Sequence, residues 1–180
     1  FPKDVQALIK TSKDFGYTTK ILNAVEEVNF EQKHVIPRKV VERFGEDLTG
    51  KTFAIWGLAF KPDTDDMRQA AAITIINELT KRGAKVKAYD PKAEKEARVC
   101  YLKDNKNVEY CDSKYTVLVD ADAMILVTEW KEFRQPDFIE IKKRLKNPVI
   151  FDGRNQFDAH SLSDKGFEYY QIGVSSKLNK

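Results

Sequence analysis

The chain has 180 residues, 42% of them hydrophobic and 33% charged, and its 31 basic and 28 acidic side chains leave a net charge of +3. This length suits one α/β domain of ordinary size with a short additional element. The two signs of charge are interleaved without a basic stripe, so we expect no nucleic-acid partner. No apolar run approaches the roughly 20 residues of a membrane span, and no secretory signal pattern opens the chain. We therefore expect a cytoplasmic protein without a membrane partner.

Cysteines and histidines are too few and too scattered to suggest a metal site or a disulfide framework. Cys100 and Cys111 match the reduced, structural thiols that are usual in the cytosol. His34 and His160 lie far apart, without the spacing of metal ligands. The chain opens at Phe1 without an initiator methionine, and we interpret it as a piece of a longer protein.

The first 45 residues carry a helical pattern. Apolar residues at helical spacing predict a helix over 4–13 and a longer one over 19–44, which Pro37 should break or kink. After residue 45 the pattern changes to alternating strands and helices. We therefore predict two parts, a helical region over 1–45 and a separate domain over 46–180.

The second part alternates strands with helices joined by short connections. The predicted strands cover 51–56, 84–89, a short segment near 108, 123–127, 149–151 and 167–172, and the predicted helices cover 67–81, 93–99, 115–120 and 136–145. Such alternation indicates an α/β fold, a doubly wound Rossmann-like parallel sheet with helices on both faces. Ligands of these sheets bind at the carboxyl ends of the strands. The candidate residues are therefore those after the strands, at 57–68, 90–91, 128–130 and 152–154.

The loop over residues 57–68 reads Gly-Leu-Ala-Phe-Lys-Pro-Asp-Thr-Asp-Asp-Met-Arg. It lacks both the G-x-G-x-x-G fingerprint and the Walker A pattern, so it should not hold a pyrophosphate on glycine amides. Lys61, whose backbone Pro62 restricts, could donate to a phosphate or hydroxyl group, and Arg68 is a second candidate. The acidic residues between them are more simply explained as favouring the start of the next helix.

Aromatic side chains and one further arginine stand near the predicted strand ends. Trp56 lies inside a strand and should pack in the core, whereas Phe60 and Trp130 could either pack in the core or stack on a base. The guanidinium of Arg154 suits a bidentate phosphate contact. The alternative for this arginine is an ion pair with a nearby acid, Asp152 or Asp158.

Taken together, these segments resemble the UDP-glucose/GDP-mannose dehydrogenase family. Residues 1–5, Phe-Pro-Lys-Asp-Val, resemble the sequence that follows the catalytic cysteine in the family motif G-G-S-C-F-P-K-D. Residues 57–68 resemble the family loop G-x-x-F-K-x-x-[ST]-x-D-x-R, and 128–130 and 151–154 match two further stretches in the same order. The resemblance covers essentially the whole chain.

The resemblance implies a whole enzyme with an N-terminal NAD-binding domain, a central helical dimerisation region and a C-terminal nucleotide-sugar-binding domain. Such an enzyme oxidises UDP-glucose to UDP-glucuronate, a precursor of polysaccharides, with two NAD. Its cysteine thiolate traps the aldehyde as a thiohemiacetal, which becomes a thioester and is hydrolysed. This chain would be the C-terminal part of a homodimeric enzyme, beginning directly after that cysteine. We expect it to be inactive alone, because the cysteine and the NAD domain are absent from it.

The resemblance also implies roles for individual residues. Asp4 resembles the aspartate that positions or activates water in catalysis. The cofactor contacts would be Phe1, Pro2, Lys3 and Arg68, and the substrate contacts would be Phe60, Lys61 and Arg154. The phenylalanine before Pro2 favours UDP-glucose, since GDP-mannose relatives tend to have leucine there.

Other interpretations stay open on the sequence alone. The chain could come from a GDP-mannose or another nucleotide-sugar 6-dehydrogenase. It could instead be a flavodoxin-like binding or regulatory module, with Asp90 or Asp152 at a strand end as a phosphoacceptor. A structural role in dimerisation through residues 19–44 is compatible with the enzyme interpretation.

Overall fold

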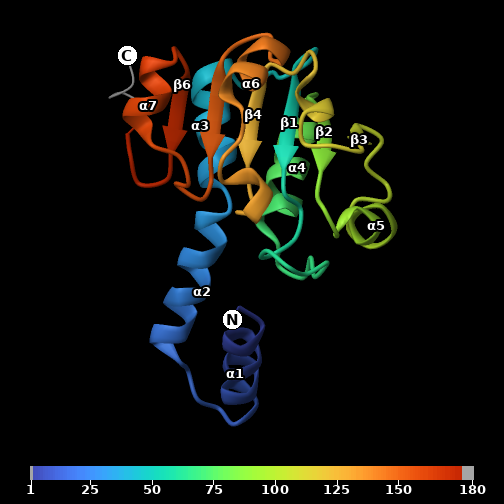
Figure 1. The fold of residues 1–180 in the computed structure, drawn as a ribbon. Helices are drawn as coiled ribbons and strands as arrows, with labels where there is room; N and C mark the ends of the chain where they lie inside the picture. Colours follow the sequence, from blue (N-terminus) through green and yellow to red (C-terminus); the bar gives the residue numbers. More distant parts are fainter. Residues whose placement is uncertain (1, 176–180) are drawn as a thin grey trace. The chain divides into compact units, whose positions relative to one another are not determined.

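The computed structural model describes residues 2–175 and divides the chain into two compact units, 1–35 and 36–180. The first unit is a pair of helices, α1 (Pro2–Asp14) and α2 (Lys20–Gln32) (Figure 1). Gly16, at φ +74°, ends α1 in the left-handed conformation that glycine adopts readily. The Gln6 amide donates to the Glu26 carboxylate and so ties the two helices together.

The second unit is built on a sheet of six parallel strands in the order β3-β2-β1-β4-β5-β6, which confirms the predicted fold class (Figure 1). The strands are β1 (Thr52–Trp56), β2 (Lys85–Tyr89), β3 (Val108–Tyr110), β4 (Ala123–Leu126), β5 (Val149–Asp152) and β6 (Glu168–Gln171). Phe53 of β1 pairs with Val86 on one side and Ala123 on the other. The strand order therefore reverses between β1 and β4, which is where doubly wound sheets bind ligands.

Helices cover both faces of this sheet, with α3 and α4 on one face and α6 on the other (Figure 1). Because β-strand side chains alternate between faces, Phe53 packs against Phe44 of α3, while Trp56 packs against Phe133 on the opposite face. The helical elements are α3 (Val35–Phe44), α4 (Ala71–Lys81), α5 (Glu94–Glu96), the π-helix η1 (Ala97–Tyr101), the 3₁₀ helices η2 (Thr116–Leu118) and η3 (Lys131–Phe133), α6 (Phe138–Arg144) and α7 (Ala159–Asp164). Within the described residues, no helix is both long and apolar enough to cross a membrane.

Helix α3 belongs to the sheet domain. Ile36 and Val40 are buried in its core, and Arg43 makes a bidentate ion pair with Glu168 of β6, at 2.6 and 2.8 Å. The compact units therefore divide after Val35, earlier than the expected boundary after residue 45. The break between α2 and α3 falls at residues 33–34, and Pro37 lies in the first turn of α3. Pro37 has no amide hydrogen for the carbonyl of Lys33, four residues earlier, and its ring crowds that carbonyl, so the break predicted for Pro37 is confirmed and lies one turn before the proline.

Two other helices differ from the sequence prediction. The helix expected over 67–81 begins at Ala71, because Gln69 has a φ of +63°, which an α-helix does not accommodate. The segment expected to be helical over 115–120 forms a single 3₁₀ turn. Helix α7 was not predicted; its start is capped by Asp158, which accepts from the Ser161 amide at 2.8 Å.

Candidate functional site

Three loops at the carboxyl ends of the central strands are joined by direct contacts. The Thr128 hydroxyl, after β4, donates to the Ala59 carbonyl, after β1, at 2.6 Å. The next residue, Glu129, pairs with Arg154 after β5, with Nε–Oε2 at 2.5 Å and a second bond at 2.6 Å. The loops after β1, β4 and β5 therefore form one contiguous surface at the switch point of the sheet.

The single glycine of the first loop is required by its neighbour in space. Gly57 has a φ of +94°, and a Cβ at this position would lie 2.5 Å from the Cβ of Thr128. Glycine thus allows the loop after β1 to pass directly over the loop after β4. This close approach explains why a glycine follows β1 although the dinucleotide fingerprint is absent.

A buried carboxylate after β2 holds the loop after β1 in place. Asp90 is 4% exposed, and its Oδ2 accepts from the amides of Leu58 (2.6 Å) and Ala59 (3.0 Å) and from the Trp130 indole (3.0 Å). Its Oδ1 accepts from the amides of Lys92 and Ala93. The main-chain amides that could bind a phosphate in a dinucleotide-type loop are thus already bonded to a carboxylate.

Asp152, at the end of β5, does the same for the loop that carries Arg154. Its carboxylate is fully buried and accepts from the amides of Arg154, Gln156 and Phe157. It also accepts from the Tyr169 hydroxyl at 2.7 Å, and burial together with this carboxylate raises the pKa of Tyr169. Both oxygens of Asp90 and of Asp152 are therefore engaged and out of solvent, which argues against the hypothesis of a phosphoacceptor at either position.

The predicted contact residues on these loops present their side chains outward. Phe60 is 40% exposed, and Lys61 and Arg154 are also exposed. Arg154 pairs with Glu129, an acid that the sequence analysis did not consider as its partner. Arg68 is exposed as well, with its guanidinium 2.7 Å from the carboxylate of Asp66.

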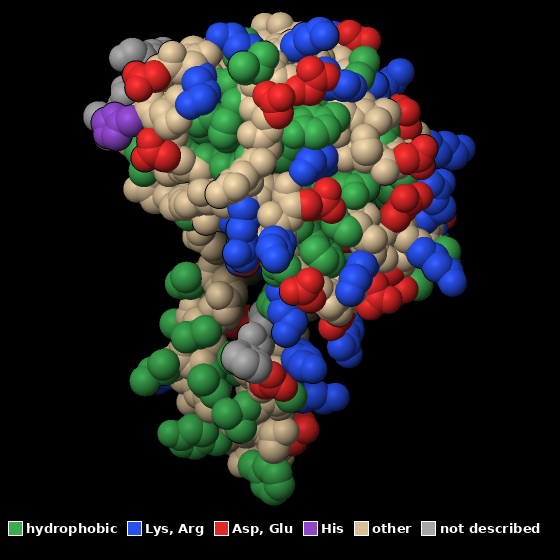
Figure 2. Space-filling view, in the orientation of Figure 1, with side chains coloured by type: hydrophobic (Ala, Val, Ile, Leu, Met, Phe, Trp, Pro, Cys, Tyr) green, Lys and Arg blue, Asp and Glu red, His purple; other side chains and the backbone are tan. Residues whose placement is uncertain are grey.

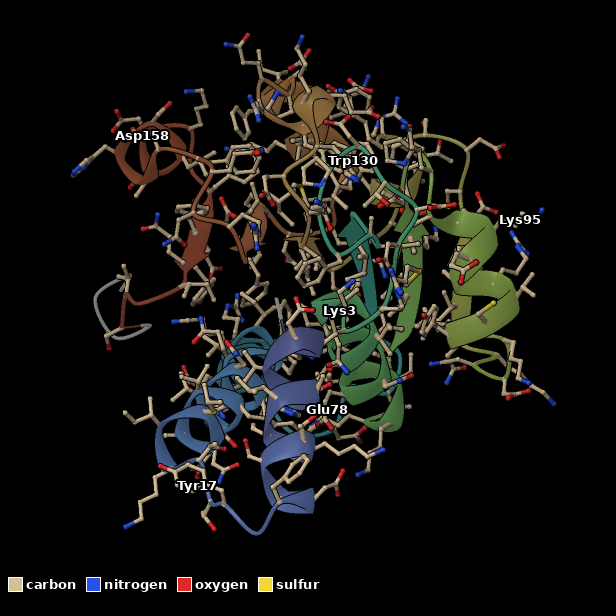
Figure 3. The ribbon with its side chains drawn as sticks, turned by 90° about the horizontal axis from the view of Figure 1, so that it is seen from below. Lys3, Tyr17, Glu78, Lys95, Trp130 and Asp158 are labelled. Carbon is tan, nitrogen blue, oxygen red and sulfur yellow. The ribbon has the colours of Figure 1, made fainter. Side chains whose placement is uncertain are left out.

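The structure decides for both tryptophans between packing in the core and stacking on a base. Trp56 is fully buried and donates to the Lys114 carbonyl at 2.7 Å, which confirms its expected place in the core. Trp130 is 5% exposed and lies among the strand-end loops, bonded to Asp90, so it packs there and has no free face for a base (Figure 3). Phe60 remains the candidate for stacking.

The remaining predicted residues belong to the other unit. Lys3 and Asp4 are exposed on the first turn of α1, which begins at Pro2 (Figure 3). Phe1 lies outside the described residues. Phe60, Lys61 and Arg154 thus lie on connected loops of the sheet domain, while Lys3 and Asp4 belong to the helix pair.

Neither cysteine is activated as a nucleophile. Burial raises the pKa of Cys111, and local desolvation, with Glu96 beside it, raises that of Cys100. A raised pKa favours the protonated, less reactive thiol. Cys111 is buried, as expected of a structural thiol, whereas Cys100 is exposed. Among residues 2–175, no group of three acidic, histidine or cysteine side chains could hold a metal ion.

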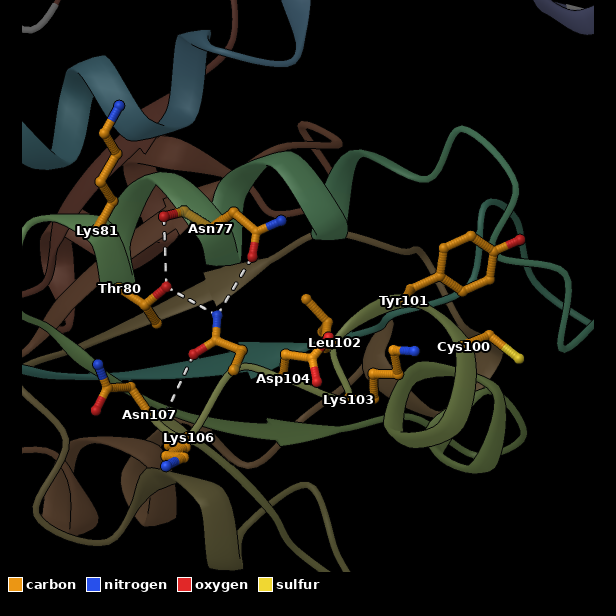
Figure 4. A pocket seen from close by; sticks show the side chains of 11 residues that line it. Asn77, Thr80, Lys81, Cys100, Tyr101, Leu102, Lys103, Asp104, Lys106 and Asn107 are labelled. Atoms are coloured by element: carbon orange, nitrogen blue, oxygen red, sulfur yellow. Dashed lines mark hydrogen bonds between the residues drawn. The ribbon is translucent and has the colours of Figure 1, made fainter.

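A groove lies away from the strand-end loops. This groove of about 550 Å³ runs between the end of α4 and the segment leading into β3 (Figure 4). Polar side chains of the groove bond to one another, with the Asn105 amide donating to the Thr80 hydroxyl at 2.9 Å and to the Asn77 carbonyl oxygen at 3.3 Å. The groove therefore lies beside the amino end of β3, opposite to the edge where sheets of this type bind ligands.

The fold and these loops define a Rossmann-like ligand-binding domain with cationic and aromatic groups at its switch point. Residues 54–159 match the model of the UDP-glucose/GDP-mannose dehydrogenase family, UDP binding domain. This match covers more than half of the chain and includes all three loops. The chain belongs to the UDP-glucose/GDP-mannose dehydrogenase family.

Individual relatives agree with this assignment. The chain is 41% identical over 175 residues to a UDP-glucose 6-dehydrogenase of Pseudomonas aeruginosa, and 40% identical over 173 residues to one of Bacillus subtilis. Each alignment covers 96% of this chain, which spans 39% and 37% of those relatives' lengths. A solved UDP-glucose dehydrogenase from Pyrobaculum islandicum superposes with a TM-score of 0.78 at 30% identity, over 95% of this chain and 36% of that one.

Proposed function

We propose that the sheet domain binds the UDP part of UDP-glucose at the carboxyl ends of β1, β4 and β5. The observation that carries this proposal is the contiguous surface of three loops that presents Phe60, Lys61 and Arg154 at the switch point of the sheet. A nucleotide sugar offers a planar base, two phosphates and a polar sugar. An exposed aromatic ring and two cations are the groups that complement such a ligand.

Each of the three side chains has a distinct role in this proposal. Arg154 binds phosphate oxygens bidentately, exchanging its Glu129 partner for the ligand. Lys61 supplies a point charge to a phosphate or a donor to a hydroxyl group, and Phe60 contacts the base or the sugar. Side chains must supply these contacts, because Asp90 already occupies the amides of Leu58 and Ala59.

We further propose that the chain is part of a UDP-glucose 6-dehydrogenase that forms UDP-glucuronate for polysaccharide synthesis in the cytoplasm. NAD would supply the hydride acceptor in both oxidation steps. The sheet domain does not fit a dinucleotide itself, since its first loop has one glycine and no free amides at Leu58 and Ala59. The exposed Lys3 and Arg68, with Phe1 and Pro2, would contact a cofactor bound mainly by another part of the enzyme, and Asp4 would position the hydrolytic water.

The chain alone should lack dehydrogenase activity, because neither of its two thiols is activated and its first loop does not suit NAD. Mixing it with UDP-glucose and NAD and following NADH absorbance tests this. Turnover that depends on the chain would contradict the proposal.

The helix pair α1–α2 is proposed as a homodimerisation surface. Its exposed apolar side chains are Leu8, Phe15, Tyr17, Ile21, Val25, Val28 and Phe30. Figure 2 shows hydrophobic side chains along the surface of this helix pair. An exposed apolar group of this size is typical of an interface. In sedimentation, Val28→Asp should shift the chain towards the monomer. Val99→Asp, at a similarly exposed valine in the sheet domain (59% against 65%), should not. A chain that is monomeric at every concentration before mutation would contradict the dimer.

Calorimetric titration with UDP, UDP-glucose and GDP-mannose tests the ligand proposal. UDP and UDP-glucose should bind, and Lys61→Ala should weaken both, whereas Lys95→Ala, at an exposed lysine of α5, should not. Tighter binding of GDP-mannose would favour the alternative nucleotide sugar. If nothing binds, the titration is repeated on a longer protein in which the N-terminal part of a UDP-glucose 6-dehydrogenase relative precedes this chain. Failure there would refute the proposed ligand.

A further inference from the structure

The main chain at Ala59 is held from both sides by buried side chains. Its amide donates to Asp90 Oδ2 at 3.0 Å, and its carbonyl accepts from the Thr128 hydroxyl at 2.6 Å. Ala59, Asp90 and Thr128 are 2%, 4% and 2% exposed. Hydrogen bonds to a charged or buried partner are stronger than those in water, so this pair forms a two-sided clamp on one residue, holding the peptide units before and after it.

The clamp lies immediately before the residues that face solvent. The chain leaves the core between Ala59 and Phe60, and the Phe60 amide then bonds to the Asp66 carbonyl at 2.9 Å, which closes the loop over residues 60–66. Lys61 lies within this closed loop. The positions of Phe60 and Lys61 therefore depend on where the clamp fixes Ala59.

The carboxylate of Asp90 also connects the loops that follow neighbouring strands. Oδ2 of Asp90 accepts from the Trp130 indole, two residues after Thr128, while Oδ1 accepts from the loop after β2 at Lys92 and Ala93. One buried group thus links the loops after β1, β2 and β4. The loop with Arg154 joins this assembly through Glu129.

We propose that Asp90 and Thr128 are positioning residues that set the geometry of Phe60 and Lys61 for nucleotide binding, without contacting the ligand. This inference rests on the proposed function of the site. Both side chains are buried with their polar atoms bonded to protein, so they act through Ala59. A carboxylate suits the central position because both of its oxygens accept, with three donors on one and two on the other. An asparagine would turn an NH₂ group towards amide donors in either orientation.

Paired variants test the clamp through hydrogen exchange and UDP affinity. Thr128→Val keeps the shape and removes the donor, and Thr128→Ser restores the hydroxyl. Asp90→Asn removes half of the acceptors. Asp122→Asn is the matched control, since Asp122 is equally buried (4%) and accepts from Thr52 at the opposite, amino edge of the sheet.

Thr128→Val should speed exchange at the amides of residues 59–61 and weaken UDP binding roughly tenfold, while Thr128→Ser should restore both. Asp122→Asn can lower thermal stability but should leave UDP affinity and loop exchange unchanged. Unchanged exchange at residues 59–61 in Thr128→Val, or equal loss of affinity in Thr128→Val and Asp122→Asn, would overturn the proposal. Thr128→Val and Thr128→Ser still test the proposal if Asp90→Asn does not fold. If the unmodified chain binds no UDP, the titration of the longer protein decides the proposed function, and hydrogen exchange at residues 59–61 alone tests the clamp.

Discussion

Replacing Gly57 with alanine tests the close approach on which the arrangement of the loops depends. The added Cβ would lie 2.5 Å from Thr128 Cβ and 2.7 Å from its backbone nitrogen, so a rigid strand end must move. The left-handed backbone, at φ +94°, costs a residue with a Cβ about 1–2 kcal/mol. Overpacking a buried contact adds about 1–3 kcal/mol. The expected destabilisation is thus about 2–5 kcal/mol, a large share of the roughly 5–15 kcal/mol that stabilises a typical domain.

Gly45 provides a control matched in backbone conformation. Its φ is +93°, but a Cβ there would meet nothing within 4 Å, so Gly45→Ala should show the conformational cost alone, about 1–2 kcal/mol. Urea and thermal unfolding of both variants give the difference. At roughly 2–4 °C per kcal/mol, Gly57→Ala should melt several degrees below Gly45→Ala. Equal destabilisation of the two variants would show that the contact of Gly57 with Thr128 carries no energy and would refute the steric reasoning.

Three further predictions concern charges. Arg154→Ala should change the unfolding free energy by less than about 1 kcal/mol, because its pair with Glu129 is partly exposed, yet calorimetry should show weaker UDP binding; unchanged affinity would remove Arg154 from the site. The ion pair with Arg43 lowers the pKa of Glu168 below its ordinary 4.5, so it stabilises the fold at neutral pH and this contribution is lost as pH falls through the lowered pKa. In urea unfolding, the loss of unfolding free energy in Glu168→Gln relative to the unmodified chain should therefore shrink below pH 4.5 and persist above it. A loss that does not depend on pH would contradict this prediction. Burial, with Glu132 nearby, raises the pKa of Tyr89 to about 12, so the stability it contributes is complete below pH 10 and is lost as pH rises from 10 to 12. The free energy of unfolding should fall less steeply between pH 10 and 12 for Tyr89→Phe than for the unmodified chain. Identical pH profiles of the two proteins would contradict the raised pKa of Tyr89.

The sequence was sufficient for the fold class because continuous apolar runs and their spacing reflect burial directly. Strands β1 and β4 are buried along nearly their whole length, and their runs of apolar residues stand out. Short elements were harder, since α7 has six residues and its main local signal is the cap at Asp158. Helix α3 carries a periodicity like that of α2, but its packing on the sheet depends on distant residues such as Glu168, which no local pattern includes.

The site was predicted in part. The rule that ligands bind after the strands of a parallel sheet, together with the family motif, led to Phe60, Lys61 and Arg154. Asp90 was predicted as a strand-end acid, but its bonds to Leu58, Ala59 and Trp130 were not, because these partners are 31 to 40 residues away in the sequence. Glu129 was missed as the partner of Arg154 for the same reason, being 25 residues away. Such contacts are set by the meeting of strand ends, which composition and spacing do not reveal.

The central claim is that UDP binds at the carboxyl ends of β1, β4 and β5. Amide chemical-shift mapping of the isotopically labelled chain during UDP titration tests this most directly. The largest shifts should fall at residues 57–61, 128–130 and 153–155, with residues 77–81 and 102–107 around the groove of Figure 4 unchanged. Shifts confined to that groove, or saturable binding that leaves the three loops unperturbed, would contradict the account.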